Sequence, residues 1–239
     1  MSVEPAPLQT AQVYEQLRHE ILTGRFPPDT PISQIKLAER LGVSRTPLRE
    51  ALRTLQREGF ILSEPNRRVR VAALSVTDLE ELYAARIALE SLAIKITVKR
   101  FSSSDIDDLD AVLAAMDEKA MTHDYDEWEV PHRRFHALLR QHAGARVTSM
   151  LADLGAHSER YRRVYLSQPI AWTSAGVEHR AIAEACRAGD DIAAAELLAR
   201  HLARTALTVV ASIAPEHDAM AVRTALRLVT ETPMTKEAA

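Results

Sequence analysis

Four histidines in the C-terminal half of the chain are spaced so that they could bind one metal ion. His132 and His136 are four residues apart, which places them on the same face of a helix. His179 and His201 stand on either side of the turn at residues 189–191, whose centre is midway between them. In an antiparallel helical hairpin they would lie at the same height on neighbouring helices. Imidazole nitrogen suits zinc, nickel, copper or iron, although a solitary histidine usually has a structural or surface role.

The same histidines lack the base that metal-dependent hydrolysis needs. The segment from His132 to His136 has the histidine spacing of a zinc protease but no glutamate between the two. Arg133 cannot accept a proton at neutral pH. We therefore predict that the chain is not an enzyme. The alternative from another class is a metal-dependent enzyme joined to a DNA-binding unit, which turnover of a small acid by the purified protein would reveal.

Arg86 interrupts an apolar stripe that includes Leu79, Leu82 and Leu89. A guanidinium that faces a protein core needs an anion, because an unpaired buried charge is strongly destabilising. Glu90, one helical turn along, could supply that anion as an internal ion pair. The other interpretation is that Arg86 holds an anionic ligand.

A second polar group lies in the N-terminal third of the chain. Arg45 and Arg49 fall on one face of a predicted helix, and arginine can donate two hydrogen bonds to guanine in the major groove of DNA. The hydroxyl groups of Ser44 and Thr46, with the unpaired N–H groups of the helix start, suit contacts to phosphate. The alternative is that both arginines are ordinary solvated side chains of a helix.

Local signals predict the elements that carry these N-terminal residues. Apolar spacing, serine caps and glycine stops predict helices at about residues 10–22, 33–41 and 45–58, followed by a hairpin of residues 60–62 and 69–71. Two helices joined by a short turn at residues 42–44 are typical of a helix-turn-helix. Arg67 and Arg68, at the hairpin tip, are candidates for contacts to the DNA backbone or the minor groove.

The rest of the chain reads as helices only, so the fold class is mainly α. We predict a winged helix-turn-helix domain over residues 1–74, an all-helical bundle over residues 75–230 and a disordered tail over residues 231–239. The predicted helices end near residues 100, 121, 142, 166, 188 and 213, with a loop at 169–174 and a weaker last helix at 217–229.

Composition narrows the class of protein. The single Cys186 cannot form an internal disulfide, and neither a long apolar segment nor a secretion signal is found, so we expect a cytoplasmic protein that does not cross a membrane. Residues 1–74 carry 11 lysines and arginines against 8 acidic residues, whereas the remaining residues carry 19 against 25. This local basic excess can bind phosphates, although a solvated helix face would show the same excess.

The segment LGVSRTPLREAL at residues 41–52, followed by Leu55, Glu58, Gly59 and Phe60, resembles the GntR family of regulators. The resemblance extends over about residues 9–73 and implies a DNA-binding function. It implies operator base contacts from Arg45 and Arg49, DNA contacts from Ser44 and Thr46, and a further basic contact in the preceding helix, where this chain has Lys36. The family usually has a glycine at the wing tip, where this chain has Arg67 and Arg68.

The helical half, over about residues 77–215, resembles the FCD domain of the FadR-type subfamily. The resemblance rests on Tyr83-Ala84-Ala85-Arg86 with Leu89-Glu90, on Arg134-Phe135-His136, and on Glu178-His179-Arg180 through Gly189-Asp190 to His201. Metal-binding FCD domains have a carboxylate at the position of His132 and histidines at the other three. The resemblance implies that Arg86 holds the carboxylate of a small organic or sugar acid beside the metal. Arg162 and Tyr165 are further candidates for lining that pocket.

Together these patterns predict a homodimeric transcription repressor that reads a palindromic operator and responds to an acid effector bound beside a divalent metal. Zinc is the first choice of metal, with nickel, iron or manganese as alternatives. The second hypothesis keeps DNA binding but makes the metal itself the signal, with no organic effector.

Overall fold

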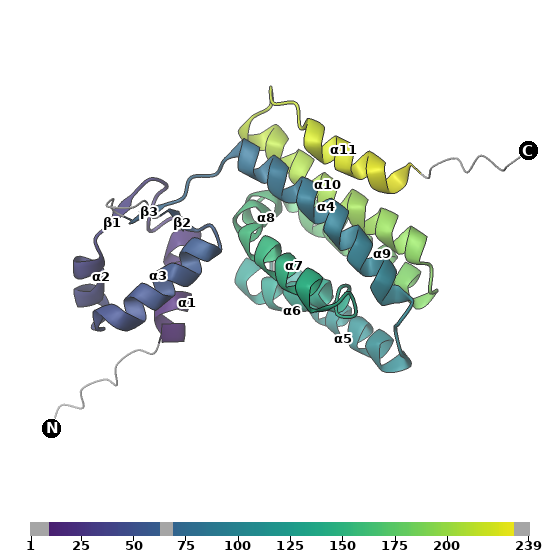
Figure 1. The fold of residues 1–239 in the computed structure, drawn as a ribbon, viewed down its shortest axis with the longest axis horizontal. Helices are drawn as coiled ribbons and strands as arrows, with labels where there is room; N and C mark the ends of the chain where they lie inside the picture. Colours follow the sequence, from purple (N-terminus) through teal and green to yellow (C-terminus); the bar gives the residue numbers. More distant parts are fainter. Residues whose placement is uncertain (1–9, 63–68, 232–239) are drawn as a thin grey trace, which may run out of the picture. The chain divides into compact units, whose positions relative to one another are not determined.

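The computed structural model describes residues 10–62 and 69–231, and the chain separates into two compact units between Leu74 and Ser75. Figure 1 shows the elements of both units, and each unit is described here by itself. Within these residues, every helix is too short or too polar to cross a membrane.

The N-terminal unit has three helices and a small sheet. Its elements are α1 (Thr10–Leu22), β1 (Pro31–Ile32), α2 (Gln34–Leu41), α3 (Arg45–Arg57), β2 (Ile61–Leu62) and β3 (Val69–Val71). Strand β3 lies between β1 and β2 and is antiparallel to both. Strand β1 was not predicted, because a strand of only two residues is too short to show an alternating pattern in the sequence. It forms because Pro31 and Ile32 pair with Arg70 and Val69.

Local signals position α3 within this unit. Ser33 caps α2 by accepting a hydrogen bond from the Lys36 backbone N–H. Gly42 ends α2 in the left-handed conformation, with φ of 64°, which favours glycine. Leu48, Leu52 and Leu55 then bury one face of α3 in the core, so that its other face is exposed.

The C-terminal unit is a bundle of helices. They are α4 (Val76–Val98), α5 (Ser103–Ala120), α6 (Tyr125–Leu138), α7 (Ala145–His157), α8 (Glu159–Leu166), α9 (Pro169–Arg187), α10 (Asp191–Ile213) and α11 (Met220–Thr230). Helix α4 packs along α10 and α11, while α5 packs against α6 and α9. The mainly helical fold class is confirmed.

Three predicted boundaries in this unit were wrong. The helix predicted to end near residue 166 is two helices, because the chain breaks at the buried Ser158, whose hydroxyl donates to the Gly155 carbonyl. The loop predicted at residues 169–174 is the first part of α9, because a proline at the first helical position needs no N–H partner. Helix α6 ends at Leu138 rather than near residue 142, and tight turns follow.

Two predictions fall outside the described residues. Arg67 and Arg68 belong to the segment 63–68, and the predicted tail belongs to residues 232–239 apart from Glu231.

Candidate functional site

The four predicted metal-binding histidines meet in the core of the helical unit. His132 and His136 come from α6, His179 from α9 and His201 from α10. One ring nitrogen from each lies within 4.8 Å of those from the other three, and every one of these side chains is buried. The hairpin of α9 and α10 brings the His179 and His201 rings to 4.5 Å between centroids. The tertiary structure therefore gathers the four side chains that the sequence singled out.

Two of these rings contact carboxylates that fit the second shell of a metal site. Nδ1 of His136 lies 3.3 Å from Glu90 Oε2, and Nδ1 of His201 lies 2.9 Å from Glu178 Oε2. A metal-bound histidine usually donates its other ring N–H to a carboxylate or carbonyl, which orients the ring. With the proton on Nδ1, the Nε2 atoms of both rings keep the lone pairs that a metal needs.

His179 is buried with no hydrogen-bond partner for either ring nitrogen among the described residues. Such a polar side chain costs free energy unless a ligand satisfies it. Burial lowers the pKa of His179 well below its usual range, and burial likewise lowers the pKa of His136 to about 4. Both rings are therefore neutral near pH 7, which is the state that binds metal.

His132 has a different environment from the other three histidines. Its ring stacks on Trp128, with centroids 4.3 Å apart. Its Nδ1 lies 3.3 Å from Glu129 Oε2, at an angle that does not make a hydrogen bond. Burial lowers the pKa of His132 well below its usual range despite that nearby carboxylate. A neutral imidazole therefore lies at the position where the FCD resemblance implies a carboxylate.

Two buried ion pairs flank the histidines. Arg86 Nε donates to Glu90 Oε1 at 2.7 Å, and Arg162 forms two hydrogen bonds with Glu129. Burial alone would raise the pKa of Glu90, but the Arg86 guanidinium outweighs it and holds that pKa below its usual range. Arg162 has the same effect on Glu129. Both carboxylates are thus ionised, and each is balanced by an arginine.

Arg86 therefore forms the internal ion pair with Glu90 that was one of its two sequence-based interpretations. Its Nη1 also donates to the hydroxyl of Ser158, at 2.9 Å. Its Nη2 makes no hydrogen bond with any residue that the structure describes, and Arg86 lines a cavity beside the histidines. The ion pair with Glu90 consequently leaves one nitrogen of Arg86 available to a ligand.

The cavity has a volume of about 190 Å³. It is lined by Arg86, His132, Arg133, His136, Arg140, Ala152, Gly155, Ala156 and Arg162. Arg162 was proposed from the sequence as a lining residue and is one, whereas Tyr165 is not. A small anion in this cavity would therefore lie next to two of the four candidate metal ligands.

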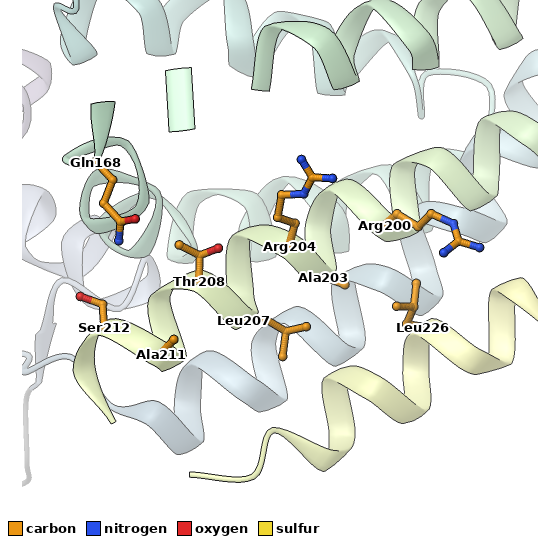
Figure 2. A pocket seen from close by; sticks show the side chains of 9 residues that line it. All are labelled: Gln168, Arg200, Ala203, Arg204, Leu207, Thr208, Ala211, Ser212 and Leu226. Atoms are coloured by element: carbon orange, nitrogen blue, oxygen red, sulfur yellow. The ribbon is translucent and has the colours of Figure 1, made fainter. Parts of the chain in front are cut away.

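A larger and more open groove of about 740 Å³ lies elsewhere on the same unit. Figure 2 shows its polar side chains on α10, with Gln168 from the α8–α9 connection and Leu226 from α11. None of the four histidines lines it. Its Arg204 nevertheless reaches the metal site indirectly, because Nη1 lies 2.8 Å from Glu178 Oε1. The groove is thus connected to His201 through two contacts, from Arg204 to Glu178 and from Glu178 to His201.

The candidate DNA-binding residues lie together on the N-terminal unit. Arg45, Thr46 and Arg49 are exposed on the first turns of α3, and Ser44 precedes that helix without making a side-chain cap. Neither Arg45 nor Arg49 forms an ion pair with any residue that the structure describes. Lys36 is exposed on α2. These side chains are therefore free to contact DNA.

Sequence reasoning missed several residues of both sites. Arg53 is exposed one turn after Arg49 and lines a hollow of about 150 Å³ with it, which the spacing of four could have indicated. Glu129 is three residues before His132 and Glu178 immediately precedes His179, and this closeness in sequence could have indicated both carboxylates. Arg140 carried no local signal, because its place in the cavity depends on α7.

Comparisons with known proteins agree with this division. Residues 9–71 match the gntR family of bacterial regulatory proteins, and residues 81–204 match the FCD domain. The chain is 32% identical over 130 residues to the HTH-type transcriptional regulator YdhC of Bacillus subtilis (strain 168), an alignment that covers 54% of this chain and 58% of YdhC. It is 28% identical over 205 residues to the HTH-type transcriptional repressor GlaR of Escherichia coli (strain K12), covering 79% and 90%.

Among solved structures, E. coli McbR/YncC has the same fold. The TM-score is 0.71 at 21% sequence identity, over 85% of this chain and 97% of that chain. A GntR transcriptional regulator from Rhodococcus sp. RHA1 has a TM-score of 0.65 at 24% identity, over 85% and 98%.

The FCD match alone spans just over half of the chain, and the gntR match covers the unit that carries α3. The family and the relatives are transcription regulators rather than enzymes, which confirms the prediction drawn from the missing catalytic base. The chain therefore belongs to the gntR family of bacterial regulatory proteins, and it is a DNA-binding transcriptional regulator with an FCD domain.

Proposed function

We propose that this regulator is a repressor whose operator binding is controlled by a small carboxylate effector bound beside a divalent transition metal. The metal is zinc in the first place, with nickel, iron or manganese as alternatives, and its ligands are the four histidines. The observation that carries this proposal is His179, a buried imidazole whose two nitrogens find no partner among the described residues while three further imidazoles surround it.

The donor set supports both the metal and an acidic effector. Four neutral imidazoles supply lone pairs but no negative charge, so a divalent ion held by them would keep its full charge. The three carboxylates that lie beside these rings, Glu90, Glu129 and Glu178, are each paired with an arginine. An anion entering the cavity would meet the metal's charge and the available nitrogen of Arg86.

The exposed face of α3 supports the DNA-reading part. We propose that Arg45 and Arg49 contact bases, and that Lys36, Ser44 and Thr46 contact phosphates. In a two-fold symmetric homodimer, two such helices would read a palindromic operator. Repression is the direction proposed because GlaR is a repressor. A cytoplasmic location follows from access to the bacterial chromosome.

The test measures operator affinity of the full chain as zinc is varied, and then as carboxylic acids are varied at saturating zinc. The operator is first selected from a random DNA pool. A change of affinity with an acid supports the proposal. A response to zinc alone favours the second hypothesis, a metal-responsive regulator with no organic effector. A His179→Asn variant should lose the acid response and keep the DNA affinity of the metal-free protein. An acid response that persists in this variant would contradict the proposed site.

A further inference from the structure

The charges that line the effector cavity do not balance. Four of the nine lining residues are arginines, two are the candidate metal ligands of α6, and the other three are alanine or glycine. No acidic residue is among the described residues that line it. The positive charges must therefore be balanced from behind the cavity wall or by a ligand.

Two of the four arginines are balanced from behind the wall. Arg86 pairs with Glu90, and Arg162 pairs with Glu129, with all four side chains at most 7% exposed. Each pair is close to neutral as seen from the cavity.

Arg140 is the partly buried arginine that has no carboxylate of its own among the described residues. It follows the end of α6, and its guanidinium makes no hydrogen bond or ion pair with any described residue. Its Nε atom is fully buried, although the residue as a whole is only partly buried, and its Nη1 lies beside Gly155, which also lines the cavity. Burial lowers the pKa of Arg140, yet an arginine stays protonated in proteins. Among the described residues, Glu90 is the carboxylate whose charge acts on Arg140, and Glu90 is already paired with Arg86. Two guanidinium groups therefore share one carboxylate, which leaves a net positive charge beside the cavity.

The fourth arginine, Arg133, needs no anionic partner, because solvent reaches its side chain. The Arg133 side chain is 51% exposed, and its closest carboxylate is that of Glu129, at 3.9 Å. Water and salt screen a charge in this position. Arg140 is partly buried and Arg133 lies at the rim, so the two arginines can be compared directly.

We propose that the effector is a short dicarboxylate, whose first carboxylate lies at the metal and Arg86 and whose second pairs with Arg140. This inference rests on the proposed function and names the class of ligand for the same site. A cavity of about 190 Å³ has the volume of about six water molecules, which suits a short-chain acid. A monocarboxylate would satisfy the first position and leave the partly buried Arg140 guanidinium without a hydrogen-bonded anion. Discrimination therefore comes from Arg140.

The test compares dicarboxylates from malonate to adipate with monocarboxylates of the same carbon number, by calorimetry on the zinc-loaded full chain. We expect the best dicarboxylate to bind about tenfold or more tightly than its monocarboxylate counterpart. Arg140→Met should abolish this ratio by lowering dicarboxylate affinity much more than monocarboxylate affinity, and Arg140→Lys should keep part of the ratio. Arg133→Met is the matched control and should keep the full ratio.

The outcomes separate the two proposals. Equal binding of both acid classes, or a ratio that survives Arg140→Met, would overturn the dicarboxylate inference and leave the effector site standing. Binding of neither class to zinc-loaded protein would overturn the effector proposal itself, and this inference with it. Loss of monocarboxylate binding in Arg140→Met would show that Arg140 holds the first carboxylate, which contradicts the arrangement proposed. Circular dichroism of each variant checks that it is folded.

Discussion

His201 and Glu178 join α10 to α9 through a contact of 2.9 Å between Nδ1 and Oε2. The other oxygen of the same carboxylate lies 2.8 Å from Arg204 Nη1. Glu178 is 15% exposed, and its partner Arg204 lines the groove in Figure 2. The carboxylate is placed to orient the His201 ring and is itself held by an arginine.

Removing that carboxylate should weaken metal binding. We expect Glu178→Ala to lower zinc affinity about 10- to 100-fold, because the His201 ring loses the acceptor that sets its tautomer and orientation. Competition with a coloured chelator measures this. Glu184→Ala, which removes an exposed carboxylate of the same helix, is the control and should leave zinc affinity unchanged. Equal affinities in the two variants would contradict the second-shell role.

We expect the Ser158 hydroxyl to contribute substantially to the free energy of unfolding. Its hydroxyl oxygen accepts hydrogen bonds from Arg86 and Arg162, both buried. Ser158→Ala leaves these donors short of an acceptor, at a cost of about 1–3 kcal/mol in the free energy of unfolding.

Tryptophan fluorescence during urea unfolding measures this cost, because both tryptophans, Trp128 and Trp172, belong to the helical unit. The exposed Ser212→Ala should change the free energy of unfolding by less than about 0.5 kcal/mol. A Ser158→Ala value as small as this one would show that the hydroxyl is dispensable.

The metal-free helical unit should lose stability on mild acidification. Burial lowers the pKa values of His132, His136 and His179, that of His136 to about 4, whereas unfolded histidine has a pKa of about 6.5. Between these values the unfolded chain binds more protons than the folded one, so the free energy of unfolding falls as pH falls. The slope is at most about 1.4 kcal/mol per histidine and pH unit.

Urea unfolding of the metal-free protein between pH 7 and pH 5 checks this expectation. His179→Asn should have a shallower slope than the unmodified protein. The exposed His123→Asn should keep the full slope, since asparagine tolerates the positive φ of 53° at that position. A steep slope retained by His179→Asn would mean that other groups cause it.

Residues that contact bases and residues that contact phosphates should differ in how their substitution affects DNA binding. Arg49→Ala is expected to cost about 1–3 kcal/mol per half-site and to relax sequence preference at the base that it reads. Lys36→Ala should weaken binding to all sequences alike and reduce the salt slope by about one. Titrations of both variants against selected and scrambled operators, at several salt concentrations, distinguish them. An Arg49→Ala protein with unaltered preference would remove Arg49 from base reading.

Much of the DNA-binding unit was predictable because its signals are local. Ser33 and Gly42 mark the ends of α2 through hydrogen bonds to backbone groups a few residues away, and Ser44 precedes α3 in an extended conformation. The leucine spacing defines the buried face of α3. The same applies to the four histidines. Their spacing on α6 and about the α9–α10 turn was enough to predict that they meet.

What the sequence by itself determined was therefore the set of helices and the side chains that each turn places on one face. Only the tertiary structure decided the break at Ser158, the strand pairing of Ile32 with Val69, and the position of Arg140 without a carboxylate. Each of these depends on contacts between segments far apart in the chain. Whether a buried charge is balanced is a property of all the elements around it, and no local pattern contains that information.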